Sequence, residues 1–293
     1  MDILVFGATG NTGSLIVNQL KEKQANFGVA VSKEGKSDGL GLEASQSRVA
    51  NYDDQASLSA AMAGVETIYF VMPISPNMVP WTENVIAAAK EAGVQRIVKQ
   101  SGLNPRLDAT SDLIRDHAET DQMIVDSGVD YTILGANSFY QNFYGSVPSI
   151  QAEGAFYGPL GDKAYSNIDI HDVAAVAVEV LTNEGHSQKI YPLTGPSALT
   201  SAEQAKAISQ ASGKEVSFVN VPKDAFEGAL NGAGLDAWTS KMLAEASEWF
   251  AIADYASVTN NVEAILGRPA RSFEDFAQEL AHVINKDAIE ADM

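Results

Sequence analysis

Three glycines, Gly7, Gly10 and Gly13, stand three residues apart near the N-terminus. They follow the apolar run Ile3–Phe6, and residues 14–23 then place apolar side chains at helical spacing. This pattern predicts a strand, a tight turn and a helix start. The first glycine allows the sharp turn, the second lets the backbone approach a pyrophosphate, and the third lets helix and strand pack closely. The segment therefore predicts a dinucleotide-binding unit, which constrains the chain to an α/β fold.

Apolar strand patterns and helical patterns continue to alternate along the chain. Strands are predicted at residues 27–31, 48–50, 67–72, 96–99 and 131–134. Such alternation predicts a parallel sheet with helices on both faces. We predict a Rossmann-type doubly wound parallel sheet with a smaller C-terminal α/β domain. The predicted domains are a dinucleotide-binding domain over 1–145, with a returning segment near 165–195, and a smaller substrate-covering domain over 146–293. After Ser146 the pattern loosens, and Lys286–Met293 reads as a frayed acidic tail.

The composition is acidic, with 38 Asp and Glu residues against 19 Lys and Arg, a net charge of −19. This charge argues against nucleic acid and anionic membrane surfaces as partners. Because there is no cysteine, disulfides, thiolate catalysis and Cys-ligated metals are excluded. The four histidines show no ligand spacing, so no metal is expected. No signal peptide and no membrane-spanning run is recognisable. We expect a cytoplasmic protein that acts on a small molecule. The sequence is compatible with a homodimer.

Ligands of doubly wound sheets collect at the carboxyl ends of the strands. The glycine turn and the strand ends therefore supply the candidate cofactor-binding residues. These are Gly7, Thr9, Gly10, Asn11, Thr12, Gly13, Ser32, Lys33, Asp53, Met72, Pro73, Gln100, Ser101, Asn137, Ser138 and Phe139. Asp53 lies in an acidic turn that is typical of an adenine site, and an Asx helix cap explains this turn equally well.

The end of the second predicted strand indicates the cofactor. An NAD site usually places Asp or Glu there to hold the ribose 2′-hydroxyl, whereas this chain has Ser32. A 2′-phosphate is therefore not repelled, and Lys33 or Lys36 could pair with it. Glu34 works against this pairing. We predict NADP as the cofactor in preference to NAD.

The densest group of aromatic and amide side chains lies at residues 135–144, directly after the sixth predicted strand. Aromatics interleaved with amides suit a flat conjugated ligand next to a nicotinamide ring. A packed domain junction explains the same composition equally well. The candidate substrate residues are Trp81, Tyr140, Asn142 and Phe143.

Several segments together resemble NmrA-like proteins, a group of the atypical short-chain dehydrogenase/reductases. They are the glycine turn at 7–13 and the segments 51–54, 88–98, 127–134, 172–174 and 266–273. Within the group, the chain is most similar to bacterial NADPH:quinone oxidoreductases and triphenylmethane reductases. The resemblance implies a nicotinamide near Met72–Pro73, Gln100–Ser101 and residues 137–139. It also implies a role for His117, because family members often carry Lys or His at that position.

Two positions depart from the pattern of this group. Many relatives carry a basic residue where this chain has Ser32, and many read Leu-Arg where it has Leu134-Gly135. The first difference weakens the prediction of NADP. The second puts the usual shape of the nicotinamide pocket in doubt.

Ordinary short-chain dehydrogenases donate a proton from a Tyr that has a Lys four positions later on the same helix face. None of the nine tyrosines of this chain has a lysine at that offset. Reduction of a quinone or a dye needs less help, because solvent can protonate the product. His117 is the candidate catalytic residue, as a proton donor or an electrostatic aid, with a structural or cofactor-contact role as the alternative.

Two functions follow from these observations. The first is an NADPH-dependent reductase that transfers hydride to a quinone-like or other flat electrophilic conjugated substrate. The alternative is an NAD(P)-binding redox-sensing regulatory protein with little or no turnover. The missing Tyr–Lys pair is compatible with both.

Overall fold

The structure, a computed structural model, describes residues 1–286. The chain forms two compact units, and each is described by itself. Unit 1 consists of Met1–Leu107, Arg115–Ala136 and Ile170–Pro192. Unit 2 consists of Asp108–Ile114, Asn137–Asp169 and the chain from Leu193 onward. Of the predicted C-terminal tail, residues 287–293 lie outside the described part of the chain.

A seven-stranded sheet forms the core of unit 1, with the order β3-β2-β1-β4-β5-β6-β9. Its strands are β1 (Ile3–Phe6), β2 (Phe27–Val31), β3 (Ser47–Val49), β4 (Thr67–Val71), β5 (Arg96–Gly102), β6 (Asp130–Ala136) and β9 (Lys189–Leu193). The neighbouring pairs from β3 to β6 are parallel. Every residue of β1 and β2 is buried, as expected for parallel strands that are covered on both faces.

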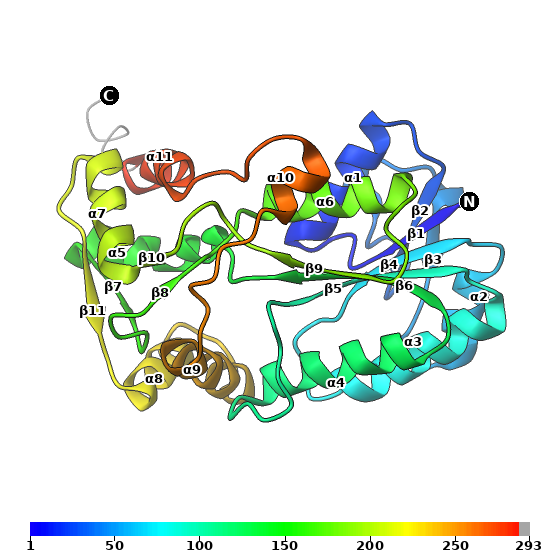
Figure 1. The fold of residues 1–293 in the computed structure, drawn as a ribbon, viewed down its shortest axis with the longest axis horizontal. Coiled ribbons are helices and arrows are strands. Elements are labelled where there is room, and N and C mark those ends of the chain that lie inside the picture. Colours follow the sequence, from blue (N-terminus) through cyan, green and yellow to red (C-terminus); the bar gives the residue numbers. More distant parts are fainter. Residues whose placement is uncertain (287–293) are drawn as a thin grey trace. The chain divides into compact units, whose positions relative to one another are not determined.

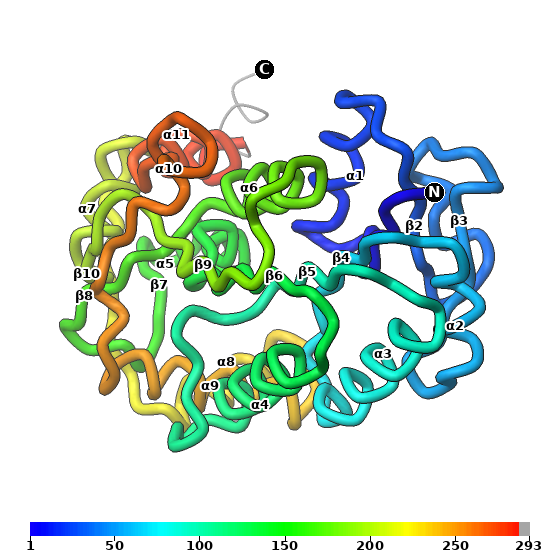
Figure 2. The backbone as a smooth tube through the Cα atoms, turned by 45° about the vertical axis from the view of Figure 1, so that its right-hand side comes forward, coloured from blue at the N-terminus to red at the C-terminus, as the bar shows by residue number. Residues whose placement is uncertain are grey.

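Helices cover both faces of this sheet. Figure 1 shows α1 (Asn11–Glu22) and α6 (Ile170–Thr182) on one face. On the other face lie α2 (Gln55–Met62), α3 (Met78–Ala92) and α4 (Asp112–Asp126), as the turned view in Figure 2 also shows. Only the part of α4 from Arg115 onward belongs to unit 1. The arrangement confirms the predicted doubly wound sheet of Rossmann type.

Unit 2 is built around a separate apolar core. Its helices and strands are α5 (Val147–Glu153), β7 (Ala155–Gly158), β8 (Ala164–Tyr165), β10 (Leu199–Thr200), α7 (Ser201–Ser212), β11 (Ser217–Asn220), α8 (Lys223–Gly232), α9 (Ala237–Ile252), α10 (Asn261–Leu266) and α11 (Phe273–Ile284). The buried face of α11 packs with α7, and its aromatic residues Phe273 and Phe276 lie in the core. β7 pairs with β11 in parallel, and β8 pairs with β10 in antiparallel fashion.

Several elements differ from the sequence prediction; β6, for example, ends at Ala136 and not at residue 134. Strand β5 extends to Gly102 instead of ending at residue 99, because its ladder with β6 continues through the pairs Ser101–Gly135 and Gly102–Ala136. Helix α5 forms where the sequence pattern was loose. Its boundaries carry ordinary signals, since Pro148 stands in the first turn and Gly154 ends the helix in the left-handed conformation.

Candidate functional site

The glycine turn joins β1 to α1, and its geometry requires glycine. Gly7 has a φ of +70°, which L side chains rarely adopt. A Cβ added at Gly13 would lie 2.1 Å from the carbonyl oxygen of Gly7. The N–H of Gly10 donates to that same oxygen at 2.9 Å, so the turn is closed by a backbone hydrogen bond. The first turn of α1 therefore lies directly against the end of β1.

The start of α1 fits a pyrophosphate. Gly10 is the N-cap residue, and in the described chain no side chain caps this helix start. There is also no acidic residue in its first turn. Backbone N–H groups and the positive end of the helix dipole therefore face outward, as an anion site requires. Around this start Thr9 and Asn11 are exposed, whereas Thr12 is buried.

Ser32 and Lys33 follow β2 and are exposed. The ammonium group of Lys36 donates a hydrogen bond to Ser32 Oγ at 3.3 Å. The ammonium group of Lys36 therefore lies next to Ser32, the position where an NAD site usually has a carboxylate. This arrangement suits a 2′-phosphate better than a ribose 2′-hydroxyl.

The acidic turn after β3 contacts α3. Asp54 caps α2 by accepting hydrogen bonds from the N–H groups of Ala56 and Ser57. Asp53 Oδ1 accepts a hydrogen bond from Trp81 Nε1 at 2.6 Å. The indole ring also stacks on the ring of Tyr52, with the centroids 5.5 Å apart. The structure thus brings Trp81, a candidate substrate residue, to the turn that was predicted for adenine.

The ends of β4 and β5 carry four further candidates. Met72 and Gln100 are buried, and Gln100 Oε1 accepts a hydrogen bond from the hydroxyl of Tyr69 at 2.7 Å. Pro73 is exposed. Ser101, the fourth, belongs to a buried polar network between β5 and α4.

Lys99, Ser101, His117 and Asp121 form this network in unit 1. The ammonium group of Lys99 pairs with Asp121 Oδ1. Ser101 Oγ donates to Asp121 Oδ2 at 2.9 Å and lies 3.3 Å from His117 Nδ1. A Cβ at Gly102 would meet the His117 ring at 3.3 Å, so the glycine leaves room for the imidazole. The network ends at the carboxyl end of β5, where ligands of such sheets bind.

Burial changes the protonation of this network. It is the main cause that lowers the pKa of His117 to about 3, and the charge of Lys99 lowers this pKa further. His117 is therefore neutral at neutral pH. Burial also lowers the pKa of Lys99 and raises that of Asp121, and the attraction within the pair opposes both shifts. A neutral imidazole with so low a pKa is poorly suited to donate a proton.

The remaining candidates belong to unit 2. Asn137 is buried, accepts from the N–H of Ser138 at 2.8 Å and donates to Ser166 Oγ at 3.1 Å. Phe139 forms an isolated bridge with Ile168. Asn142 is exposed, and its Nδ2 donates to Ser138 Oγ at 3.1 Å.

Tyr140 and Phe143, both candidate substrate residues, lie in the aromatic core of unit 2. Tyr140 is only 2% exposed, and its ring centroid lies 5.2 Å from that of Phe273. The centroid of Phe143 lies 5.1 Å from that of Phe156 and 5.3 Å from that of Phe273. Both rings are used in packing within unit 2, which is neither a substrate contact nor the domain junction that the sequence offered as the alternative.

Lys99 and Asp121 were not among the site residues predicted from the sequence. A signal was present, because Lys99 directly follows the apolar residues Ile97 and Val98 in a strand whose inner positions are all buried. A buried lysine requires an acidic partner. Which of the many acidic residues is the partner becomes clear only in the folded structure, where α4 brings Asp121 to Lys99.

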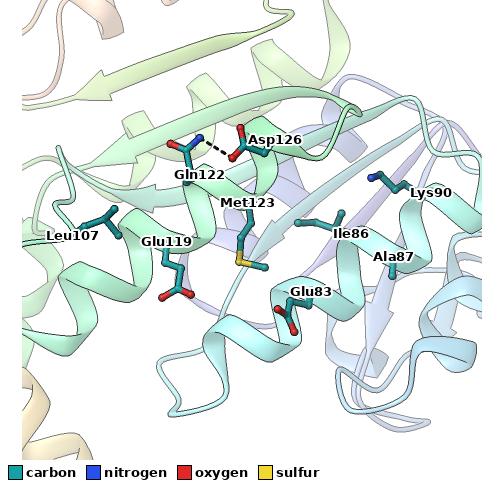
Figure 3. Close-up of a pocket in the computed structure, with 9 residues that line it drawn as sticks. All are labelled: Glu83, Ile86, Ala87, Lys90, Leu107, Glu119, Gln122, Met123 and Asp126. Carbon is teal, nitrogen blue, oxygen red and sulfur yellow. Dashed lines mark hydrogen bonds between the residues drawn. The ribbon is translucent and has the colours of Figure 1, made fainter.

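Two cavities of unit 1 lie away from the glycine turn. One of about 520 Å³ opens between α3 and α4, with Ile86 and Met123 among acidic neighbours, and Figure 3 shows its side chains. None of the candidate site residues lines it. The other, of about 800 Å³, is lined by residues at the amino ends of the strands, including Ile3, Thr67 and Asp130. Because the glycine turn stands at the carboxyl ends, neither cavity is the dinucleotide site.

Residues 1–286 also bear on metal binding and on membrane insertion. No group of three or more His, Asp and Glu side chains is placed to hold a metal ion there. In the same part of the chain, no helix has the length and apolarity that crossing a bilayer requires.

Comparison with known proteins gives consistent matches. Residues 7–184 match the NAD(P)H-binding family. The chain is 36% identical to NAD(P)H azoreductase of Xenophilus azovorans, over 94% of this chain and 96% of that protein. It is 31% identical to quinone oxidoreductase 2 of Escherichia coli strain K12, over 97% of this chain and 99% of that protein.

Solved structures are similar over the same length. The NADPH complex of the E. coli NADPH-dependent quinone oxidoreductase has a TM-score of 0.87 at 30% identity, covering 95% of this chain and 99% of that one. A structure of Citrobacter sp. triphenylmethane reductase has a TM-score of 0.84 at 25% identity, covering 96% and 99%. The chain belongs to the NAD(P)H-binding family, as an NmrA-like atypical short-chain dehydrogenase/reductase.

Proposed function

We propose that the chain is an NADPH-dependent reductase that transfers hydride to a quinone-like or other flat electrophilic conjugated substrate. The contact of Gly13 with Gly7 at the uncapped start of α1 carries the proposal, because it forms a cradle for a pyrophosphate. The relatives support the substrate class. They are an azoreductase, a quinone oxidoreductase and a triphenylmethane reductase.

The cofactor supplies the hydride when it is bound, and the protein supplies binding and orientation. A quinone that takes one hydride and one proton becomes a hydroquinone. The chain lacks the Tyr–Lys pair that donates this proton in ordinary short-chain dehydrogenases. His117 is neutral at neutral pH. We therefore assign protonation of the product to solvent.

We propose NADPH over NADH on the basis of the residues after β2. Ser32 removes the carboxylate that would repel a 2′-phosphate, and Lys36 donates to Ser32 Oγ. Lys33 stands exposed beside them. The positive charges of these two lysines, on the segment that follows β2, favour the more highly charged cofactor.

The test incubates the purified protein with NADPH and a panel of acceptors: a quinone, an azo dye and a cationic triphenylmethane dye. We expect loss of NADPH absorbance above the blank with at least one of them. Gly13→Ala is the matched control, because its Cβ would push the start of α1 away from the end of β1 and so disturb the proposed pyrophosphate site, at a position outside the network around His117.

Cofactor binding is measured separately by NADPH fluorescence. Tight binding without oxidation of NADPH by any acceptor would refute the reductase and leave the redox-sensing regulatory protein as the function. Absence of NADPH binding would refute both, because both need the dinucleotide.

The proposed setting is the cytoplasm, with a small molecule as the substrate. The net charge of −19 supports a small molecule over nucleic acid, since phosphate backbones are bound by Lys and Arg. The absence of cysteine is compatible with a reducing compartment.

A further inference from the structure

Lys99 is a charged residue in the interior of the sheet. It is 1% exposed, and its neighbours in register are Phe70 on β4 and Ile133 on β6, both fully buried. A lysine in such surroundings is strongly unfavourable unless its charge is paired and hydrogen-bonded. The proposed reduction does not use this residue, so its presence calls for another role.

The partners of Lys99 satisfy its three N–H donors. The ammonium group pairs with Asp121 and donates to Thr120 Oγ1 at 2.8 Å. It also lies 3.3 Å from Ser101 Oγ. These contacts hold the carboxylate of Asp121 next to Ser101, so that its Oδ2 can accept a hydrogen bond from Ser101 Oγ.

This arrangement sets the direction of the hydrogen bond between Ser101 and His117. A hydroxyl group has one hydrogen, and Ser101 gives it to Asp121 Oδ2 at 2.9 Å. Lys99 can only donate. The contact of 3.3 Å between Ser101 Oγ and His117 Nδ1 must therefore be donated by the ring. In the neutral ring, Nδ1 carries the hydrogen and Nε2 has a free lone pair.

Nε2 of His117 is directed away from this network. A Cβ at Gly102 would lie 3.8 Å from it, so the ring edge passes over the glycine at the carboxyl end of β5. Within residues 1–286, no hydrogen bond of Nε2 is formed in the structure. The lone pair is thus available to a ligand at this strand end, where the dinucleotide is proposed to bind.

The charges around the ring favour the same protonation state. Lys99 on β5 faces the ring, and Asp121 on α4 reaches it through Ser101. On the same helix, Asp116 interacts electrostatically with Glu119 and Arg115. Burial, followed by Lys99, lowers the pKa of His117, so the ring stays neutral over the pH range in which the protein would work.

We propose that Lys99 and Asp121 are positioning residues: through Ser101 they hold His117 as its Nδ1–H tautomer, and Nε2 accepts a hydrogen bond from bound NADPH. The inference rests on the proposed function for the identity of the ligand. It gives His117 the role of an acceptor that orients the dinucleotide and not that of an acid. The donor on the ligand is an uncharged O–H or N–H group, such as a ribose hydroxyl or the carboxamide N–H.

The first test reads the tautomer by nitrogen-15 NMR of the imidazole rings without ligand. The chain has only four histidines, and His117→Gln identifies the signals of His117 by their loss. We expect a protonated Nδ1 and a bare Nε2 between about pH 5 and pH 8, since the range lies above the lowered pKa. A protonated Nε2 in the unliganded wild-type protein would overturn the proposal.

The second test changes the positioning residues. In the double variant Lys99→Met, Asp121→Leu, apolar side chains replace a buried ion pair, a change that proteins often tolerate. Ser101 then has no acceptor at residue 121 and can donate to His117 Nδ1. We expect the hydrogen to move to Nε2 and the Kd for NADPH to rise about tenfold, the size of one lost hydrogen bond. Ser101→Ala removes the acceptor of the Nδ1 hydrogen with the ion pair intact, so the ring should lose its preference for the Nδ1–H tautomer and the Kd for NADPH should rise.

Thr120→Val is the matched control, because it removes another hydrogen bond of the same ammonium group. The tautomer of His117 should not change in this variant. His117→Gln keeps an acceptor oxygen and should bind NADPH more tightly than His117→Ala does. A double variant that keeps both the wild-type tautomer and the wild-type Kd overturns the inference. Wild-type protein that shows the expected tautomer but binds no NADPH refutes the proposed function instead.

Discussion

Gly13 makes the most demanding contact of the glycine turn. In Gly13→Ala the new Cβ would lie 2.1 Å from the oxygen and 2.7 Å from the carbon of the Gly7 carbonyl. Backbone must move apart, and such overpacking costs about 1–3 kcal/mol of unfolding free energy. We expect a lower midpoint of urea unfolding and weaker NADPH binding.

Gly10→Ala is the control for this prediction. Its Cβ would lie 3.3 Å from the oxygen of Gly7, and Gly10 has a φ of −82° that alanine adopts without strain. We expect a smaller loss of stability than in Gly13→Ala. Equal losses in the two variants would show that the close approach of α1 to β1 is not what the third glycine provides.

Lys33 and Lys36 carry the prediction of cofactor preference. Replacing both by alanine removes two cations beside Ser32. Charge-assisted hydrogen bonds contribute about 1.5–3 kcal/mol each, so we expect the Kd for NADPH to rise at least about tenfold. The Kd for NADH, measured by the same fluorescence titration, should change little. Equal weakening of both cofactors would refute the 2′-phosphate role.

At the residue scale, a residue's role was predictable from the sequence where its cause lies within a few neighbouring residues. The spacing of Gly7, Gly10 and Gly13 is set by the backbone geometry of one tight turn. The role of Lys99 has no such cause, because its partner Asp121 stands 22 residues away on another element. A single sequence shows that a lysine in an apolar strand needs a partner, but not which carboxylate comes close.

At the scale of elements, α3 is fastened to the turn after β3 by two hydrogen bonds. Trp81 Nε1 donates to Asp53 Oδ1 at 2.6 Å, and Asn84 Nδ2 donates to the carbonyl oxygen of Tyr52 at 2.8 Å. Trp81→Phe keeps a ring to stack on Tyr52 and removes one of the two bonds. We expect unfolding free energy to fall by about 0.5–1.5 kcal/mol, measured by urea unfolding.

Asp53→Asn is the matched variant for this fastening, because an asparagine keeps an acceptor oxygen for the indole. It should lose less stability than Trp81→Phe. If Trp81→Phe were as stable as the wild type, ring stacking and the hydrogen bond from Asn84 to the Tyr52 carbonyl oxygen would be enough to hold the helix to the turn. The sequence prediction gave Trp81 to the substrate, whereas its observed contacts are with Asp53 and Tyr52 of the turn that was predicted for adenine.

The aromatic segment after β6 shows the limit of prediction at this scale. Tyr140 and Phe143 stand among amides, and such a composition suits a ligand pocket and a packed core alike. The structure supplies the partners that distinguish these cases, Phe273 and Phe276 on α11, about 130 residues further along the chain. Most strands of the sheet were predictable because parallel, doubly covered strands are apolar throughout. Packing partners that come from distant segments of the chain were not predictable.

At the scale of the whole molecule, charge is the dominant property of the sequence. A net charge of −19 on 293 residues raises the energy of the compact state through self-repulsion. Added salt screens this repulsion: the Debye length falls from about 30 Å at 0.01 M to about 8 Å at 0.15 M ionic strength. We expect the Tm measured at pH 7.5 to rise with sodium chloride, with most of the rise below about 0.15 M.

The shape of this dependence separates screening from other effects of salt. Near pH 5, closer to the isoelectric point of about 4.4, fewer net charges repel one another and the rise in Tm should be smaller. A kosmotropic effect on apolar burial would instead continue to grow at molar salt and would be similar at both pH values. A Tm at pH 7.5 that is flat between low and physiological salt would show that the acidic residues are spaced widely enough for their repulsion to contribute little to stability.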